Sequence, residues 1–317
     1  MRLPLRIPHR DTAPFDVVAF GQNSVDLVAV VAGHPARNAK YRLERFARLP
    51  GGEMATAAAV CARLGWRARY VGSFGDDDLA EVGRRSLAAE GVDLSASWTV
   101  SGTTSQFAVV IVDQETGERT VLWDRPAALT MRREQVTPAT VTSGRVLLLD
   151  ANDTAAATRA AGCARAAGIP TVADVETVQE GIADLLSQVD AIIAAEPFPR
   201  ALTGIGDPGA AIAALQREFK APLVAVTLGE RGSLTLCGGR ETHTPAFAVT
   251  CVDSTGAGDA FHGGFVAACL RAPDGEVADI MRYANAVAAL NCRALGARGG
   301  MPTASEVDAL LMAGSRA

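Results

Sequence analysis

Short apolar segments alternate with alanine-rich segments along most of the chain, and this alternation restricts the possible folds more than any other feature. Six segments are typical of strands buried on both faces, because they are apolar or β-branched and end in Gly, Asp or Glu. They are residues 16–21, 68–75, 145–150, 170–175, 190–196 and 222–229. Between them lie helix-like segments at 55–65, 78–91, 155–168 and 207–219. The pattern predicts an α/β fold with a doubly wound, mainly parallel sheet flanked by helices.

Two segments interrupt this alternation. Residues 105–124 indicate two strands joined by the turn QETGE, and residues 27–48 lack the apolar face of a helix and suit further strands. We expect them to form a small antiparallel β lid, with extra edge strands on the main sheet as the alternative. We also expect one domain over residues 15–317, mainly helical after residue 255, and a loose N-terminal extension over residues 1–14.

Composition and charge argue against several classes of protein. No apolar run reaches the roughly 18 residues that a membrane span requires, and the N-terminus lacks the apolar region of a signal peptide. The net charge is −5 without a Lys/Arg cluster, which argues against a nucleic-acid partner. The six cysteines are scattered and the four histidines are not spaced like metal ligands. The scattered cysteines are typical of buried thiols in a reducing cytoplasm.

The segment DSTGAGDAFHGG, at residues 253–264, combines a glycine-rich turn with the start of an apolar helix. Unpaired N–H groups at a helix N-terminus attract anions, so Gly256, Ala257 and Gly258 are candidates for holding a phosphoryl group in its transition state. Asp259 follows them and could accept the proton of an attacking hydroxyl. The alternative is that Asp259 caps the helix while the glycines allow close packing.

The same segment resembles the DTxGAGDxFxG signature of the PfkB, or ribokinase-like, carbohydrate kinases. A second signature of that family, a glycine pair leading into a helix, resembles GGEMATAAAVCARLG at residues 51–65. The resemblance extends from residue 15 to residue 311. It implies a ribokinase-like fold and ATP-dependent phosphorylation of a sugar or sugar derivative with Mg²⁺. In that family the GAG amides form the anion hole and the following aspartate, here Asp259, is the general base.

The resemblance also implies a set of substrate-binding residues. Asp26, at the expected end of the first strand, matches an aspartate that binds sugar hydroxyls, and Gly51 and Gly52 would let the sugar approach the backbone. Glu53 could bind a hydroxyl or cap the helix, and this choice stays open. Two positions, Thr56 and Asn152, carry neutral hydrogen-bonding residues that depart from the family's usual ones. We therefore expect a polyhydroxylated substrate that is not necessarily ribose.

The nearest match is the sulfofructose kinase subgroup. An anionic sugar would need a cation, for which Lys40 is a candidate, although a solvated lid lysine is the more common case. Trp123, on the returning lid strand, could stack on a sugar or lie at an interface between lids.

On the nucleotide side, TLGERG resembles the family's segment that approaches the phosphates of ATP. Thr227, Gly229 and Gly232 are the corresponding candidates, and Asn285 lies on the helix that borders adenine in relatives. The family's NxxE motif, which organises Mg²⁺ through water, is replaced by AEPF. Glu196 is the weak substitute for its carboxylate. Asp253 matches a region that holds a monovalent cation in some relatives, so K⁺ is a candidate cofactor.

Exposed lid edges tend to pair, so we expect a homodimer formed through the lids. A nucleoside kinase of the same fold and a non-catalytic sugar or nucleotide sensor are the alternatives. A dehydrogenase is disfavoured, because GQNSVD after the first strand lacks the GxGxxG pattern.

Overall fold

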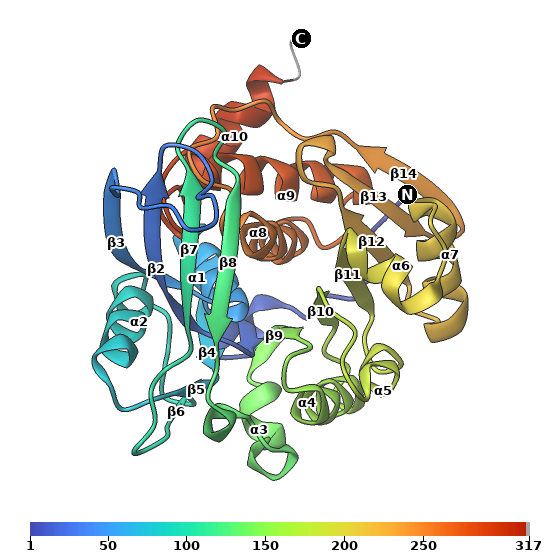
Figure 1. Cartoon of the computed structure of the whole chain (residues 1–317). Coiled ribbons are helices and arrows are strands. Elements are labelled where there is room, and N and C mark those ends of the chain that lie inside the picture. The colour runs from blue at the N-terminus through green and yellow to red at the C-terminus, as the bar shows by residue number, and fades with distance from the viewer. Residues whose placement is uncertain (315–317) are drawn as a thin grey trace.

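The computed structural model describes residues 1–314; residues 315–317, the end of the expected domain, lie outside the described residues. Eight strands form the main sheet in the order β14-β13-β12-β11-β10-β9-β1-β4 (Figure 1). Pairing is parallel from β4 to β12 and antiparallel for β13 and β14. All six predicted strands belong to it. Their bounds are β1 (Phe15–Phe20), β4 (Ala68–Val71), β9 (Gly144–Asp150), β10 (Thr171–Val175), β11 (Ala191–Ala195), β12 (Leu223–Thr227), β13 (Ser233–Cys237) and β14 (Arg240–Thr244).

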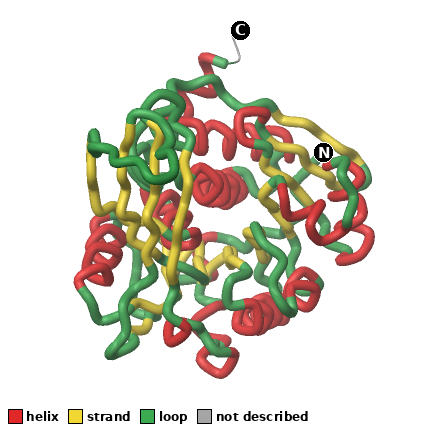
Figure 2. The backbone as a smooth tube through the Cα atoms, in the orientation of Figure 1, coloured by secondary structure: helices red, strands yellow, loops and turns green. Residues whose placement is uncertain are grey.

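Helices cover both faces of this sheet, because alternate strand residues point to opposite sides. Val17 belongs to the core beneath α1, α8 and α9, whereas Val18 belongs to the core beneath α4, α5 and α7. The tube view separates these layers, with helices in red around the yellow strands (Figure 2). The longer helices are α1 (Glu53–Arg63), α2 (Asp78–Ala89), α4 (Thr154–Ala166), α7 (Pro208–Phe219), α8 (Ala257–Arg271), α9 (Val277–Asn291) and α10 (Ala304–Ala313). The shorter helices are α3 (Pro138–Val141), α5 (Ile182–Leu186), α6 (Pro197–Thr203) and the 3-10 turns η1 (Arg10–Thr12), η2 (Ala127–Leu129), η3 (Arg133–Gln135) and η4 (Gly229–Arg231).

A separate four-stranded sheet forms the lid, with the order β3-β2-β7-β8. Its strands are β2 (Ser24–Val31), β3 (Arg45–Gly51), β7 (Phe107–Asp113) and β8 (Arg119–Asp124). The two outer pairs are antiparallel and the central pair of β2 and β7 is parallel. The expected alternative, extra edge strands on the main sheet, is wrong. The segment at residues 68–75 ends in a third, two-stranded sheet, in which β5 (Ser73–Phe74) pairs with β6 (Trp98–Thr99).

The N-terminal segment is packed, and the expectation of a loose extension is wrong. The side chains of Leu3 and Leu5 are buried in the main core. The backbone of Leu3 donates to the carbonyl of Gly275, and Val277 donates to the carbonyl of Met1. The segment therefore covers the turn between α8 and α9, because its two leucines remove apolar surface from water there.

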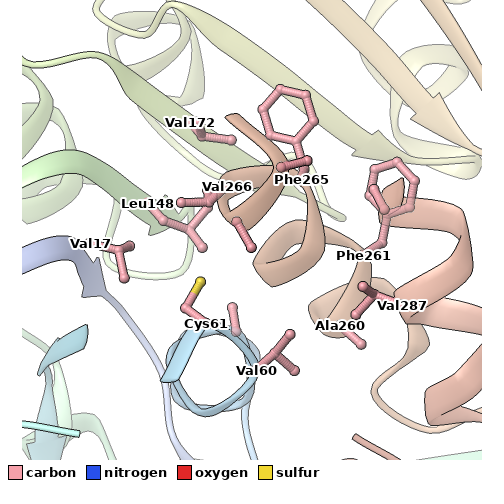
Figure 3. Close-up of a cluster of buried hydrophobic side chains, with 14 of the residues drawn as sticks. Val17, Val60, Cys61, Leu148, Val172, Ala260, Phe261, Phe265, Val266 and Val287 are labelled. Carbon is pink, nitrogen blue, oxygen red and sulfur yellow. The ribbon is translucent and has the colours of Figure 1, made fainter. Parts of the chain in front are cut away.

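Helix α8 lies at the centre of the molecule, packed between α1 and α9 (Figures 1 and 3). Its glycines allow this close approach. A Cβ added to Gly263 would lie 2.8 Å from the side chain of Val60 on α1, and one added to Gly264 would lie 2.9 Å from Val287 on α9. These two glycines thus serve packing, whereas the glycines before the helix lie at the cavity described next.

Candidate active site

One cavity lies between the lid and the carboxyl ends of β1, β9 and β10, with a volume of about 230 Å³. Six of the predicted site residues line it: Asp26, Gly52, Glu53, Asn152, Gly256 and Asp259. Lid residues, including Val110, Val121 and Trp123, close its opposite wall. Parallel α/β sheets place ligand sites at this edge, so the fold and the cavity agree on one location.

The glycine turn forms the floor of this cavity at the N-terminus of α8. Gly256 has φ +73°, and a Cβ there would lie 2.4 Å from the carbonyl oxygen of Ala297, so only glycine fits. The N–H of Ala257 donates to the carbonyl of Ser254 at 3.3 Å. The N–H groups of Gly256 and Gly258 have no acceptor within residues 1–314. They are therefore available to an anion at the positive end of the helix.

Asp259 lies in the first turn of α8 and lines the cavity. The pKa of its carboxyl is raised to about 7, first by burial and then by the nearby carboxylates of Glu176 and Asp26. A carboxyl with a pKa near neutrality is suited to general base catalysis. The alternative role as a helix cap is not observed, because the N-cap is Gly256 and no side chain caps the helix.

Asp26 lies on lid strand β2, so its expected position at the end of the first strand is wrong. Strand β1 ends at Phe20 and the chain crosses into the lid within three residues. Burial raises the pKa of Asp26 to about 6, and its carboxylate accepts a hydrogen bond from the hydroxyl of Ser24 at 2.9 Å. The lid thus carries one of the two carboxylates that flank the expected acceptor hydroxyl.

The glycine pair at the start of α1 shapes the space beside Asp26. A Cβ on Gly51 would lie 2.4 Å from an oxygen of the Asp26 carboxylate, and Gly52 has φ +89° with the backbone of Asn23 directly beside it. Gly51 does not line the cavity, but it leaves the room that the Asp26 side chain occupies.

Arg298 lies behind this glycine pair and was not predicted from the sequence. Its guanidinium is buried and donates to the carbonyl of Gly51 at 2.8 Å, to the hydroxyl of Thr56 at 3.1 Å and to the hydroxyl of Ser86 at 3.0 Å. Thr56 therefore binds Arg298 and does not line the cavity, which corrects its expected contact with substrate. Burial lowers the pKa of Arg298 to about 10, so it remains a cation, and its charge lowers the pKa of Asp26.

Glu53 and Asn152 are brought together from different elements. The amide nitrogen of Asn152 donates to Oε2 of Glu53 at 2.8 Å. Both residues line the cavity, and burial raises the pKa of Glu53 well above its usual range, as does the nearby Asp150. Glu53 is also the first residue of α1, where the helix dipole favours a carboxylate.

Two further carboxylates line the cavity at the carboxyl end of β10, Asp174 within the strand and Glu176 directly after it. Asp174 is buried, with one oxygen 3.2 Å from Nδ1 of the neutral His262 and without a hydrogen-bond donor in the described part of the chain. Burial lowers the pKa of His262 to about 4, and its Nδ1 lies 2.8 Å from the carbonyl oxygen of Gly258. The position of Asp174 at a parallel strand's carboxyl end is a signal that could have identified it.

Glu196 lies apart from the carboxylates of Asp174 and Glu176, which corrects its expected role toward Mg²⁺. Its side chain is 46% exposed and forms an ion pair with Arg231, outside the cavity lining. The carboxylates that raise the pKa of Asp259 are instead Glu176 and Asp26, and Asp259 in turn raises the pKa of Asp174.

The expected nucleotide residues lie around the ends of β12 and β13, and none of them lines the cavity. Gly229 and Gly232 have φ +58° and +89° and form the turn after Thr227. Asn285 is buried, and its amide donates to the carbonyls of Thr244 and Pro245. It therefore holds the end of β14, so the structure does not support its expected place beside adenine.

Asp253 connects the glycine turn to the segment after α9. Its two carboxylate oxygens accept from the N–H groups of Thr255 and Gly296, both at 2.8 Å. Two buried oxygens in the same region lack a donor among the described residues, Oγ1 of Thr255 and Oδ1 of Asn291. Such oxygens suit a bound cation.

Lys40 is exposed on the lid loop and does not line the cavity, which corrects its expected role. The one cation among the described lining residues is Arg119, at the start of β8. Its guanidinium donates to the hydroxyl of Ser254, in the glycine turn, at 2.8 Å. Arg119 was not predicted from the sequence, because its contact joins the lid to a turn that is distant along the chain.

A lidded α/β domain with free helix N-terminal amides and a buried carboxylate beside them defines a phosphotransferase that acts on an alcohol. The model of the pfkB family of carbohydrate kinases matches residues 15–304, so the chain belongs to this family. It is 28% identical to fructokinase-1 of Zea mays, over 93% of this chain and 97% of that protein.

Solved structures agree with this assignment. A putative ribokinase from Agrobacterium tumefaciens has a TM-score of 0.89 and 26% identity, covering 96% of this chain and 99% of that one. A fructokinase from Xylella fastidiosa with bound ATP has a TM-score of 0.79 and 25% identity, covering 95% of this chain and 99% of that one. The predicted ribokinase-like fold is confirmed. None of the described helices is long and apolar enough to cross a membrane.

Proposed function

We propose that this carbohydrate kinase transfers the γ-phosphoryl group of ATP to a hydroxymethyl group of a sugar or sugar derivative. The observation that carries the proposal is Asp259, which faces the same cavity as Asp26 and directly follows the free N–H groups of Gly256 and Gly258. A base and an anion site must both contact the reacting atoms, and this turn provides both.

In the proposed reaction, Asp26 accepts a hydrogen bond from the sugar and orients it, and Asp259 removes the proton of the attacking hydroxyl. The amides of the glycine turn stabilise the negative charge that spreads over the transferred group. Lid residues such as Trp123 exclude water, which suppresses the hydrolysis of ATP.

We propose that Mg²⁺ is held through water by Asp174 and Glu176. Carboxylate oxygens suit this ion, which keeps several waters and is usually bound by one or two carboxylates together with substrate phosphates. No group of three residues that could ligate a metal directly occurs among the described residues, which is compatible with such a site. When bound, Mg²⁺ neutralises charge on the phosphates of ATP. We extend the proposal to a monovalent cation such as K⁺ beside Asp253, supported by the two buried oxygens without donors.

We propose a homodimer formed through the outer face of the lid. Cross-strand pairing puts Phe46 beside Ala29 and Leu122 beside Val109, on the face opposite the cavity residues Ala108 and Val110. Phe46 and Leu122 are each 56% exposed. An apolar sheet face with two open edge strands is typical of an association surface.

The six cysteines are free thiols. Together with the use of ATP, this supports our proposal of a cytoplasmic location.

The test is a screen of ATP consumption with hexoses, pentoses, sugar acids and nucleosides. We expect turnover with at least one sugar, and we expect the Asp259→Asn variant to lose it. A nucleoside as the best substrate would support a nucleoside kinase instead. Tight sugar binding without any turnover would support a sensor.

A further inference from the structure

The side chain of Gln106 lines the cavity but has no part in the proposed reaction. It is 8% exposed, and its oxygen Oε1 is buried without a hydrogen-bond donor among residues 1–314. Two other lining residues have such an atom, Asp174 and Thr255, and both belong to the proposed cation sites. A buried acceptor without a partner is costly, so the oxygen of Gln106 requires a donor that the described chain does not supply.

Gln22 fixes the orientation of this amide. The side-chain nitrogen of Gln106 donates to Oε1 of Gln22 at 2.9 Å, so the oxygen of Gln106 is the atom that remains for a ligand. Gln22 is itself held by the main body of the protein. Its N–H donates to Oδ2 of Asp150 at 2.6 Å, and its carbonyl accepts from the N–H of Ala55 at 3.1 Å. An acceptor that is fixed before the ligand arrives loses little entropy on binding, which suits a residue that selects substrates.

Gln106 and Asp26 lie on neighbouring strands of the lid but at different levels. Strands β2 and β7 run side by side (Figure 1), with Asp26 paired to Ala108. The pairing continues to Gln106, whose carbonyl accepts from the N–H of Val25 at 3.1 Å. Residues two apart on an extended chain point to the same face and lie about 6.6 Å apart. Gln106 and Ala108 are two apart and both line the cavity, so Gln106 and Asp26 face different parts of one bound molecule.

The unpartnered oxygen restricts which ligands the cavity accepts. A ligand that displaces water from a buried acceptor loses affinity unless it supplies the same hydrogen bond. A hydroxyl group supplies this bond, whereas a methylene group at the same position does not. A site that is built to bind a substrate hydroxyl rejects the analogue without it far more strongly than an apolar pocket rejects a small change in size.

We infer that Gln106 is a specificity-determining residue, and that its Oε1 accepts a hydrogen bond from a second hydroxyl of the acceptor sugar. This hydroxyl is neither the one that Asp26 binds nor the one that is phosphorylated. The inference rests on the proposed sugar kinase function. Asp26 and Gln106 then fix the sugar at two points, which orients a third hydroxyl toward Asp259.

The experiment uses D-fructose, D-ribose and the sugar with the highest turnover in the screen, each with its monodeoxy derivatives. It measures kcat/KM, and Kd by calorimetry. In the wild type, the loss of one particular hydroxyl should weaken binding by about 10- to 100-fold, because it leaves the oxygen of Gln106 unpaired. Gln106→Met has a similar shape without the amide, so it should bind the complete sugar more weakly and remove the difference from that deoxy derivative. Gln106→Glu keeps an acceptor and should keep the difference.

Three further variants serve as comparisons. Gln114→Met is the matched control, because Gln114 is exposed directly after β7 and does not line the cavity, and it should change no constant. Gln22→Met releases the amide of Gln106 and should reduce the same difference in part. Asp26→Asn should alter the discrimination at another hydroxyl. Thermal unfolding is measured for each variant, because a purely structural role would lower the melting temperature and leave the discrimination unchanged.

The outcomes separate the inference from the proposed function. A sugar that is bound and phosphorylated overturns the inference alone if Gln106→Met still distinguishes it from all its deoxy derivatives as the wild type does. The inference also fails if Gln106 and Asp26 act on the same hydroxyl, or if Gln106→Glu loses the difference. Full turnover in Asp259→Asn would reject the proposed mechanism and leave the role of Gln106 standing. If no sugar of the screen is bound or turned over, the proposed function fails, and the inference fails with it.

Discussion

Arg119 on lid strand β8 donates a hydrogen bond to the hydroxyl of Ser254, which lies 135 residues further along the chain in the glycine turn. The contact joins the lid to the glycine turn that we propose as the anion site. Arg119 also lowers the pKa of Asp26 and of Asp259, so its charge reaches both carboxylates of the proposed reaction.

Arg119→Met should therefore lower kcat by about 100- to 1000-fold, the size typical of a lost donor that stabilises a transition state. Arg119→Lys should retain part of the rate, because it keeps the charge but not the planar donor pair. Steady-state kinetics with ATP and the best sugar measures this. The control Arg37→Met changes an exposed arginine and should have no effect. An unchanged kcat in Arg119→Met would remove this residue from the mechanism.

The rate should rise with pH through the range near 7. Asp259 acts as a base only when ionised, and its pKa is raised to about 7, so most of it is protonated below that pH. Glu176→Gln removes one cause of this shift and should move the midpoint of the pH–rate profile to lower pH. Asp259→Asn should reduce kcat by about 10²- to 10⁴-fold. A profile that is flat between pH 6 and pH 8, in the wild type and in Glu176→Gln, would contradict the assignment of the base.

Arg298 should position the sugar side without touching the substrate. Its guanidinium ties the carbonyl of Gly51 to Thr56, and its charge lowers the pKa of Asp26. Arg298→Met should raise KM for the sugar more than it lowers kcat. It should also move the acidic limb of the KM profile, near pH 6 in the wild type, to higher pH. Arg298→Lys should restore the pH profile in part; equal effects on KM for sugar and for ATP would indicate a general loss of structure.

The proposed Mg²⁺ site is tested by metal binding. Mn²⁺ bound together with a non-hydrolysable ATP analogue is followed by electron paramagnetic resonance. We expect Asp174→Asn and Glu176→Gln to weaken Mn²⁺ binding by about 10-fold or more, the size usual for residues that orient a metal and its waters. Glu196→Gln should have no effect, because Glu196 is exposed and paired with Arg231. If Glu196→Gln weakened Mn²⁺ binding and the other two substitutions did not, the metal site would lie at Glu196.

The outer face of the lid should carry the dimer contact. Phe46→Lys and Leu122→Lys place charges on an apolar surface and should convert a dimer to a monomer, measured by light scattering after gel filtration. The matched control is Met312→Lys, because Met312 is 64% exposed and belongs to α10 and not to a lid strand. A wild-type protein that is monomeric at all concentrations would refute the proposal.

The order of the main strands and helices followed from the sequence, since buried parallel strands and alanine-rich helices leave strong local patterns. The lid was predicted as well, although Asp26 was assigned to the wrong element. Strand β1 ends at Phe20 and β2 begins at Ser24, and the three residues between them, 21–23, are too few for a local pattern to separate the two strands. The prediction for the N-terminal segment was wrong because two leucines are too few to produce a periodic pattern, yet Leu3 and Leu5 are both buried in the main core.

The sequence by itself determined the fold class, the glycine turn and the acid that follows it, because each depends on neighbours within a few residues. The tertiary structure decided which side chains meet across long separations. Arg298 reaches Gly51 over 247 residues, and Asn152 reaches Glu53 over 99. Thr56, Lys40, Glu196 and Asn285 were misplaced for this reason: the direction of a side chain depends on the packing of distant elements, which a local pattern does not record.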